Sequence, residues 1–166
     1  MEDFRASMRL LASGVVVVCV HDEEVGDDVG LTTSSFASVS LDPPLVAVMI
    51  DRASYLDELL ERQDRWAGTI LAGHQSRLAS RFAAAGRPSA RLLLAGIAHH
   101  RGEYSGGLIV EDALAGLECR TEQRIAAGDH TILVAAVERI DYTAETGVAL
   151  TRFAGRYLSI GGSAPA

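Results

Sequence analysis

Residues 30–44 read GLTTSSFASVSLDPP. This stretch is the most informative about the fold, because a polar, extended segment ends there at two successive prolines. Six of its fifteen residues carry a hydroxyl group. The successive prolines Pro43 and Pro44 lack the N–H group that a strand or helix needs, so neither element continues through them. An extended segment from Val29 to Leu41 can offer hydroxyls and backbone amides to an oxygen-rich or anionic ligand; a polar edge strand is equally compatible with it.

Uninterrupted apolar runs lie on either side of this segment. Val15–Val20 and Leu45–Ile50 show no alternation with polar residues, which is typical of strands that are covered on both faces. The acidic stretch His21–Asp28, with Gly26 near its centre, suits a hairpin loop after the first run.

Four later segments have the length and apolar content of strands: Trp66–Leu71, Leu114–Ile125, Thr131–Ile140 and Ala149–Ile160. In the second of them, Glu118 and Arg120 alternate with Leu117 and Cys119, which predicts one face in solvent.

Three helices are expected around these strands. Phe4, Met8 and Leu11 recur at helical spacing, Ser54 can cap a helix that follows it, and a third helix is expected over Gln75–Ala85. Residues 89–107 have no clear assignment. Because strands and helices do not alternate regularly, a doubly wound parallel sheet is disfavoured, and an antiparallel barrel with peripheral helices fits better.

Composition excludes several classes of function. The 166 residues suit one domain, and the formal charge of -7 argues against a nucleic-acid binder that depends on phosphate contacts. All fifteen basic residues are arginine, so Schiff-base and P-loop lysine chemistry is impossible. No apolar run approaches the ~20 residues of a membrane span, and the first residues do not resemble a secretory signal. We therefore expect a cytoplasmic protein with no membrane partner, in which Cys19 and Cys119 are buried, reduced thiols.

A Gly-Asp-His turn at residues 128–130 precedes the apolar run from Thr131 and places His130 at the mouth of a strand. A lone histidine is more often structural than functional. His99 and His100 would point to opposite faces of an extended segment, so joint binding of a metal is disfavoured. No metal motif, dinucleotide-binding glycine pattern or nucleophile elbow is present. Arg52, Arg77 and Arg81 flank the expected helices and can meet a phosphate, although solvated helix faces explain them equally well.

Taken together, five segments resemble the short-chain flavin reductases, which supply reduced flavin to two-component monooxygenases. The matching segments are GLTTSSFASVSLDPPLVAV at 30–48, RLASRFA at 77–83, LAGLECR at 114–120, AAGDHTILVAAVE at 126–138 and FAGRYLSI at 153–160. The chain departs from the family between Arg87 and Gly107, a region that helps to shape the pocket for flavin and nicotinamide.

The resemblance implies a mainly β fold with peripheral helices, namely the six-stranded antiparallel split β-barrel of the FMN-binding type. It implies one flavin reductase-like domain over residues 1–160, followed by a disordered tail over 161–166. It also implies a homodimer with flavin in a groove near the interface between the subunits.

The resemblance further implies a role for each matching residue, and none acts as a catalytic acid or base. Hydroxyls and amides of the polar strand, the region after Leu45–Ile50, one aromatic wall and the C-terminal segment would contact flavin: Thr32, Thr33, Ser34, Ser35, Ser38, Val39, Ser40, Asp51, Ser54, Tyr55, Phe82 and Tyr157. His130 would contact the nicotinamide. Hydride transfer from nicotinamide to flavin requires stacking at close distance and no acid or base from the protein.

The expected activity is that of an NAD(P)H:flavin oxidoreductase that supplies free reduced flavin to a partner monooxygenase. FMN and FAD both remain open. NADH is favoured because no arginine is clearly placed for a 2′-phosphate, and NADPH stays an alternative. A flavin-binding barrel without nicotinamide turnover, or a flavoprotein that keeps FMN as a prosthetic group, would share most of these residues, but the Gly-Asp-His turn favours the reductase.

Overall fold

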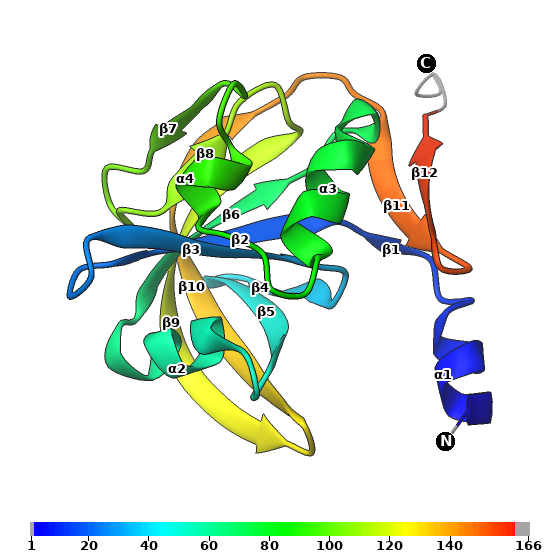
Figure 1. The fold of residues 1–166 in the computed structure, drawn as a ribbon, viewed down its shortest axis with the longest axis horizontal. Helices are drawn as coiled ribbons and strands as arrows, with labels where there is room; N and C mark the ends of the chain where they lie inside the picture. Colours follow the sequence, from blue (N-terminus) through cyan, green and yellow to red (C-terminus); the bar gives the residue numbers. More distant parts are fainter. Residues whose placement is uncertain (1, 162–166) are drawn as a thin grey trace.

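The computed structural model describes residues 2–161, and β-strands dominate its regular structure (Figure 1). In chain order the elements are α1 (Glu2–Met8), β1 (Ser13–Gly14), β2 (Val16–Asp22), β3 (Asp27–Thr33), β4 (Phe36–Leu41), β5 (Pro44–Asp51), α2 (Tyr55–Arg62), β6 (Arg65–Ile70), the 3₁₀ turn η1 (Gly73–Gln75), α3 (Ser76–Ala83), α4 (Ala90–Leu93), β7 (His99–Arg101), β8 (Leu108–Val110), β9 (Ala115–Ala127), β10 (His130–Thr143), β11 (Ala149–Phe153) and β12 (Arg156–Ile160). The tail expected at 161–166 lies outside the described residues apart from Gly161. Among residues 2–161, no helix has the length and apolar character that a membrane span needs.

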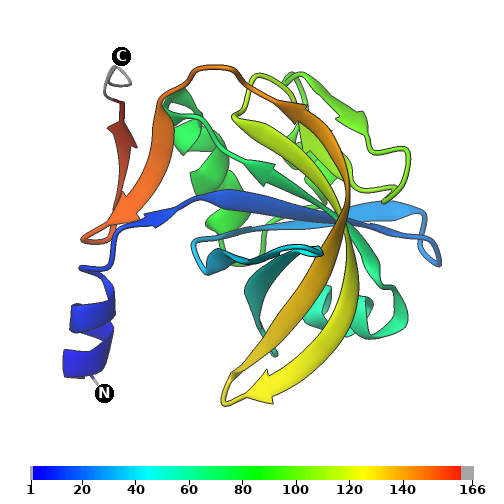
Figure 2. The same cartoon turned by 180° about the vertical axis from the view of Figure 1, so that it is seen from behind.

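The main sheet has seven strands in the order β3-β2-β6-β9-β10-β5-β4, and its neighbouring strands are antiparallel. Two smaller sheets, β1-β11-β12 and β7-β8, accompany it. The mainly β, antiparallel fold is therefore confirmed, whereas the expected count of six strands is corrected to seven in the main sheet. The segment expected to run unbroken from Val29 to Leu41 turns at Ser34 and Ser35, so that β3 and β4 become the two edges of one strongly curved sheet (Figure 2).

Strand β2 passes between two hydrophobic clusters. Val16, Val18 and Val20 belong to one cluster, with the buried Trp66, while Val15, Val17 and Cys19 belong to the other, with Phe82. Every residue from Val15 to Val20 is at most 3% exposed, which confirms the prediction of a strand covered on both faces. Because both sides of β2 are apolar, the fold needs a second layer outside the sheet, and α3 and α4 supply it.

The expected solvent-facing side of β9 is wrong at Glu118, which is completely buried. The loop between β7 and β8 covers it, and the Glu118 Oε2 atom accepts hydrogen bonds from the amides of Tyr104 (2.9 Å) and Ser105 (2.6 Å) and from the Ser105 hydroxyl (2.8 Å). Sequence alternation missed this because the covering loop lies in the segment without an assignment.

The last expected strand, Ala149–Ile160, is a hairpin of β11 and β12. Its turn uses Ala154 (φ 49°) and Gly155 (φ 78°), both in the left-handed region that strands do not use. Helices α1, α2 and α3 form as expected, but α1 ends at Met8, before Leu11, and buries none of its residues. Both cysteines are free and buried. Burial raises the pKa of each thiol to about 12, so both stay protonated and unreactive at neutral pH.

Besides Glu118, a second buried carboxylate anchors segment 87–107 to the main sheet. Asp28 is fully buried and accepts hydrogen bonds from Arg91 Nε (2.5 Å) and, in a bidentate arrangement, from both terminal nitrogens of Arg101 (2.8 Å each). His21 Nδ1 lies 3.1 Å from the same carboxylate. Burial by itself raises the pKa of Asp28, but the hydrogen bonds from Arg101 and Arg91 outweigh it and hold the pKa at about 2.

Replacing Asp28 by asparagine should lower the free energy of unfolding at pH 7 by ~3 kcal/mol, because it removes the buried partner of an ion-pair network. The folded-state pKa of Asp28 lies below its value in the unfolded chain. Its stabilisation is therefore complete above pH ~4 and is lost as the pH falls toward about 2. Urea denaturation at pH 7 and pH 3 measures both effects. The cost of D28N should shrink at pH 3, whereas the exposed control Glu23→Gln should show no cost at either pH; an equal cost of D28N at both would contradict the assignment.

Candidate functional site

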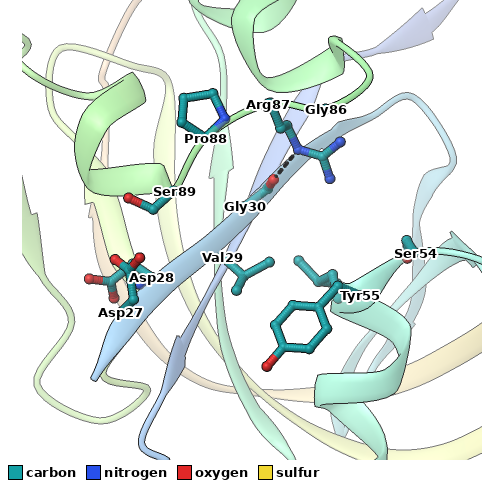
Figure 3. Close-up of a pocket in the computed structure, with 11 residues that line it drawn as sticks. Asp27, Asp28, Val29, Gly30, Ser54, Tyr55, Gly86, Arg87, Pro88 and Ser89 are labelled. Carbon is teal, nitrogen blue, oxygen red and sulfur yellow. Dashed lines mark hydrogen bonds between the residues drawn. The ribbon is translucent and has the colours of Figure 1, made fainter. Parts of the chain in front are cut away.

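A pocket of about 380 Å³ lies beside the first half of strand β3 (Figure 3). The pocket is lined by Asp27–Gly30 of β3, by residues 54–56 at the start of α2, and by residues 86–89 after α3. Three segments that are far apart in the sequence thus meet at one edge strand.

Arg87 supplies the positive charge of this pocket. Its Nε donates to the carbonyl oxygen of Gly30 (2.6 Å), and a terminal nitrogen donates to the carbonyl oxygen of Ala84 (3.3 Å). No carboxylate among residues 2–161 forms an ion pair with it. Burial lowers the pKa of Arg87 from its ordinary value, but a guanidinium remains protonated in proteins. A fixed cation without a carboxylate partner is suited to bind an anionic ligand.

The start of α2 contributes to the same wall, and its local sequence explains why it begins there. The Ser54 hydroxyl accepts from the amide of Asp57 (3.2 Å) and donates to the carbonyl oxygen of Asp51 (2.6 Å), which confirms Ser54 as the helix cap. The first amides of a helix lack partners within it, so this end favours negative charge. Together with Arg87, the helix start gives the pocket two features that suit a phosphate group.

The ring of Tyr55 forms the opposite side of the pocket in Figure 3. Its hydroxyl donates to Asp22 Oδ2 (2.5 Å) and accepts from Arg62 (3.3 Å). The hydrogen bond from Tyr55 holds the pKa of Asp22 below its usual range, against the effect of burial. The hydroxyl of Tyr55 is thus used within the protein, and its ring is the part left for a ligand.

A second, smaller pocket of about 160 Å³ lies farther along β3. Thr32 and Ser34 line it, with Arg152 of β11 and Tyr157 of β12. The Thr32 hydroxyl donates to the carbonyl oxygen of Ala79 (2.8 Å), which ties β3 to α3, while Ser34 is exposed. Hydroxyl groups, a cation and an aromatic ring thus converge at the point where β3 ends.

The Gly-Asp-His turn lies beside the residues that lead into α2. His130 is directly opposite Asp51 in the β10–β5 pairing, and the amide of Arg52 donates to the carbonyl oxygen of Asp129 (3.0 Å). His130 Nδ1 is 2.8 Å from Asp129 Oδ1, and 43% of the His130 side chain is exposed. His130 lines neither pocket of β3.

The other residues that were expected to contact flavin do not line either pocket. Phe82 is fully buried behind Gly30, so its ring supports β3 rather than facing a ligand. Thr33 is buried and accepts from the amide of Ser35 (3.0 Å). The residues of β4 line neither pocket: Ser38, Val39 and Ser40.

Sequence reasoning missed Arg87 and Arg152, and it considered Arg52, Arg77 and Arg81 instead. Arg87 stands between Gly86 and Pro88, where only the end of a helix was expected, and no local pattern marks Arg152. Among residues 2–161, no group of three or more His, Cys, Asp and Glu side chains is arranged to hold a metal ion.

Comparison with known proteins identifies the family to which this site belongs. Residues 8–161 match the flavin reductase like domain. The chain is a member of the flavin reductase family.

Two curated relatives and one solved structure illustrate the match. The NADH-dependent FMN reductase AsuE2 of Streptomyces nodosus subsp. asukaensis is 35% identical over 95% of this chain and 84% of its own. The reductase component of 4-hydroxyphenylacetate 3-monooxygenase of Thermus thermophilus is 34% identical over 84% of each chain. The Streptomyces globisporus NADH:FAD oxidoreductase SgcE6, solved with NAD and FAD fragments, has a TM-score of 0.88 and 26% identity, covering 99% of this chain and 94% of its own.

Gly30 is required because Phe82 lies against it. A Cβ atom at this position would lie 2.5 Å from Phe82 Cε1 and 3.0 Å from Cys19 Sγ. We expect Gly30→Ala to lower the free energy of unfolding by ~1–3 kcal/mol through overpacking. Gly14→Ala is the matched control, because no atom lies within 4 Å of the added Cβ. Urea denaturation of both variants checks this; an unchanged midpoint for G30A would show that Phe82 moves freely.

Proposed function

We propose that this chain is an NADH-dependent flavin reductase that transfers a hydride from NADH to FMN or FAD. The observation that carries the proposal is that two pockets lie along the same strand, β3, one suited to a phosphate and one to a polar aromatic ring. From Gly30 to Ser34 the strand advances roughly 13 Å at ~3.3 Å per residue, a length comparable with a ribityl phosphate and its attached ring. The activities given in the names of the relatives support the same function.

The residues of the two pockets would contact different parts of the flavin. Arg87 and the start of α2, capped by Ser54, would hold the phosphate, and the ring of Tyr55 would lie along the ribityl chain. The hydroxyls of Thr32 and Ser34 would meet the isoalloxazine ring, with Tyr157 closing one side. Thr33 and Ser35 line neither pocket and remain candidates for contacts outside them. Ser38, Val39 and Ser40 remain candidates for contacts outside the pockets, and Asp51 acts by holding Ser54 in place.

His130 is proposed to contact the nicotinamide. Bound flavin accepts the hydride, and the protein contributes position: the two rings must stack with the donor carbon near the acceptor nitrogen. This accounts for a site that is rich in hydrogen-bonding groups yet holds no arrangement of nucleophile and base. Asp129 orients the His130 ring through the 2.8 Å contact at Nδ1.

We also propose that the reductase forms a homodimer and passes its product to a monooxygenase. Apolar side chains of α1 and of the β11–β12 hairpin are exposed, among them Phe4, Met8 and Ile160, and both elements extend away from the body of the molecule (Figures 1 and 2). Exposed apolar groups of this kind suit the interface of a homodimer of split barrels. The product would pass to a flavin-dependent monooxygenase in the cytoplasm, where NADH is formed.

A direct test follows the absorbance of NADH at 340 nm with added FMN, FAD or riboflavin. We expect flavin-dependent oxidation of NADH; no turnover by a chain that binds flavin would indicate a flavin-binding barrel instead.

Arg87→Gln should weaken FMN binding by about 10-fold or more, because a charge-assisted hydrogen bond contributes ~1.5–3 kcal/mol, but should leave riboflavin binding nearly unchanged. Arg77→Gln, an exposed arginine of α3, is the control. Equal losses for both flavins would place the phosphate elsewhere.

The role of His130 is tested separately. His130→Ala should lower kcat/KM for NADH by about 5- to 150-fold, equivalent to ~1–3 kcal/mol, while the dissociation constant for flavin stays nearly constant. His74→Ala, an exposed histidine outside the site, serves as the control. Steady-state kinetics and flavin titration are needed on the same preparation. Equal damage to both ligands would assign His130 to the flavin site, and an effect on thermal stability alone would make it structural.

A further inference from the structure

The second pocket contains an arginine whose charge is not used within the described chain. Arg152 is half-buried in β11, and its guanidinium carbon lies 4.7 Å from the centre of the Tyr157 ring. Within residues 2–161 it takes part in no ion pair and in no side-chain hydrogen bond. What sets Arg152 apart from an exposed arginine is that its side chain is half-buried and lines a pocket, so that water solvates its charge only in part.

Other partly buried arginines show the usual arrangement. Arg124 pairs with Asp57 at 3.0 Å, and Arg120 pairs with Glu138 at 2.7 Å. A charge that is partly removed from water costs free energy unless a partner compensates for it, and stacking on an aromatic ring compensates only in part. Arg152 therefore occupies a position that a negatively charged ligand would stabilise.

We propose that Arg152 recognises the reduced form of the flavin ring, an inference that rests on the reductase function proposed above. The transfer breaks the C4–H bond of the nicotinamide and forms an N5–H bond on the flavin, with both electrons moving together. NADH becomes NAD⁺, and the neutral oxidised ring becomes a reduced ring that carries one negative charge over N1 and the C2 carbonyl oxygen. A guanidinium beside that edge interacts more strongly with the reduced ring than with the oxidised one.

The neighbouring groups explain why this discrimination falls to Arg152. Thr32 and Ser34 line the same pocket, but neutral hydroxyl groups hydrogen-bond both forms of the ring with similar strength. The guanidinium carbon lies over the Tyr157 ring, 4.7 Å from its centre, so contact with the ring restricts the position of the guanidinium before the ligand arrives. An interaction that strengthens as charge develops favours the transfer itself, whereas one that is equal for both forms does not.

The test compares the affinities of two forms of one ligand. Oxidised FMN is titrated by fluorescence, and dithionite-reduced FMN is titrated anaerobically, against wild type, Arg152→Gln, Arg152→Lys and Arg156→Gln. Arg156 is an exposed arginine of the same hairpin, so R156Q matches the change of charge outside the pocket. Thermal unfolding of each variant confirms that it is folded.

We expect R152Q to raise the ratio of the reduced to the oxidised dissociation constant by about tenfold, the loss typical of one charge-assisted hydrogen bond. A tenfold change in this ratio lowers the two-electron midpoint potential of bound flavin by ~30 mV. R152K should keep most of the wild-type ratio because it keeps the charge, and R156Q should keep all of it.

Four results would overturn the assignment. Equal weakening of both forms would show that Arg152 only shapes the pocket. An unchanged ratio with a raised KM for NADH would assign the guanidinium to the dinucleotide. If wild type oxidises NADH with flavin and the ratio of R152Q equals that of wild type, the proposal for Arg152 fails while the reductase function stands. If wild type neither binds flavin nor oxidises NADH, both fail.

Discussion

The rest of the structure depends on the burial of β2 on both faces. Six consecutive apolar residues, Val15–Val20, cannot leave either side in water, so the chain must build one cluster inside the curved sheet and another outside it. Helices α3 and α4 form the outer layer. The pockets lie where that layer ends along β3: residues 86–89 after α3 border one, and Ala83 at the end of α3 borders the other. The site is thus a consequence of how the second face of β2 is covered.

Charge is distributed so that an acidic chain still offers cations at the site. Several arginines are neutralised by carboxylates, as Arg101 is by Asp28 and Arg120 by Glu138. Arg87 and Arg152 are half-buried without such a partner: Arg87 binds carbonyl oxygens and Arg152 stacks on an aromatic ring. Both line pockets on β3, one at each end of the proposed flavin site. Each pocket on β3 therefore contains an arginine although the chain carries a net charge of -7.

The features that were predictable from the sequence are those that short-range chemistry determines. The buried strand, the stop at Pro43, the Ser54 cap and the apolar face of α3 each follow from neighbouring residues. The turn at Ser34 and Ser35 was not predictable in this way, because the pairing of β4 with β5 at the far edge of the sheet decides it. The burial of Glu118 and the placing of Arg87 and Arg152 depend on contacts between distant segments. Pattern reasoning found the hydroxyl-rich strand but not the cations that complete it.

Whether the hydroxyl groups of the site are already hydrogen-bonded within the protein bears on whether flavin is a substrate or a fixed cofactor. Thr32 already donates to Ala79, Ser54 to Asp51, and Tyr55 to Asp22, so none of these three hydroxyl groups has a donor left for a ligand. A flavin in this groove would gain few hydrogen bonds from hydroxyl donors and would depend on two cations and on stacking. Cations bind a phosphate and a reduced ring well but hold a neutral oxidised ring only weakly. Such a site binds oxidised flavin loosely and reduced flavin more strongly, and in both forms it holds the flavin through few contacts, so that flavin can exchange with solution. That behaviour is typical of an enzyme that exchanges flavin with a partner.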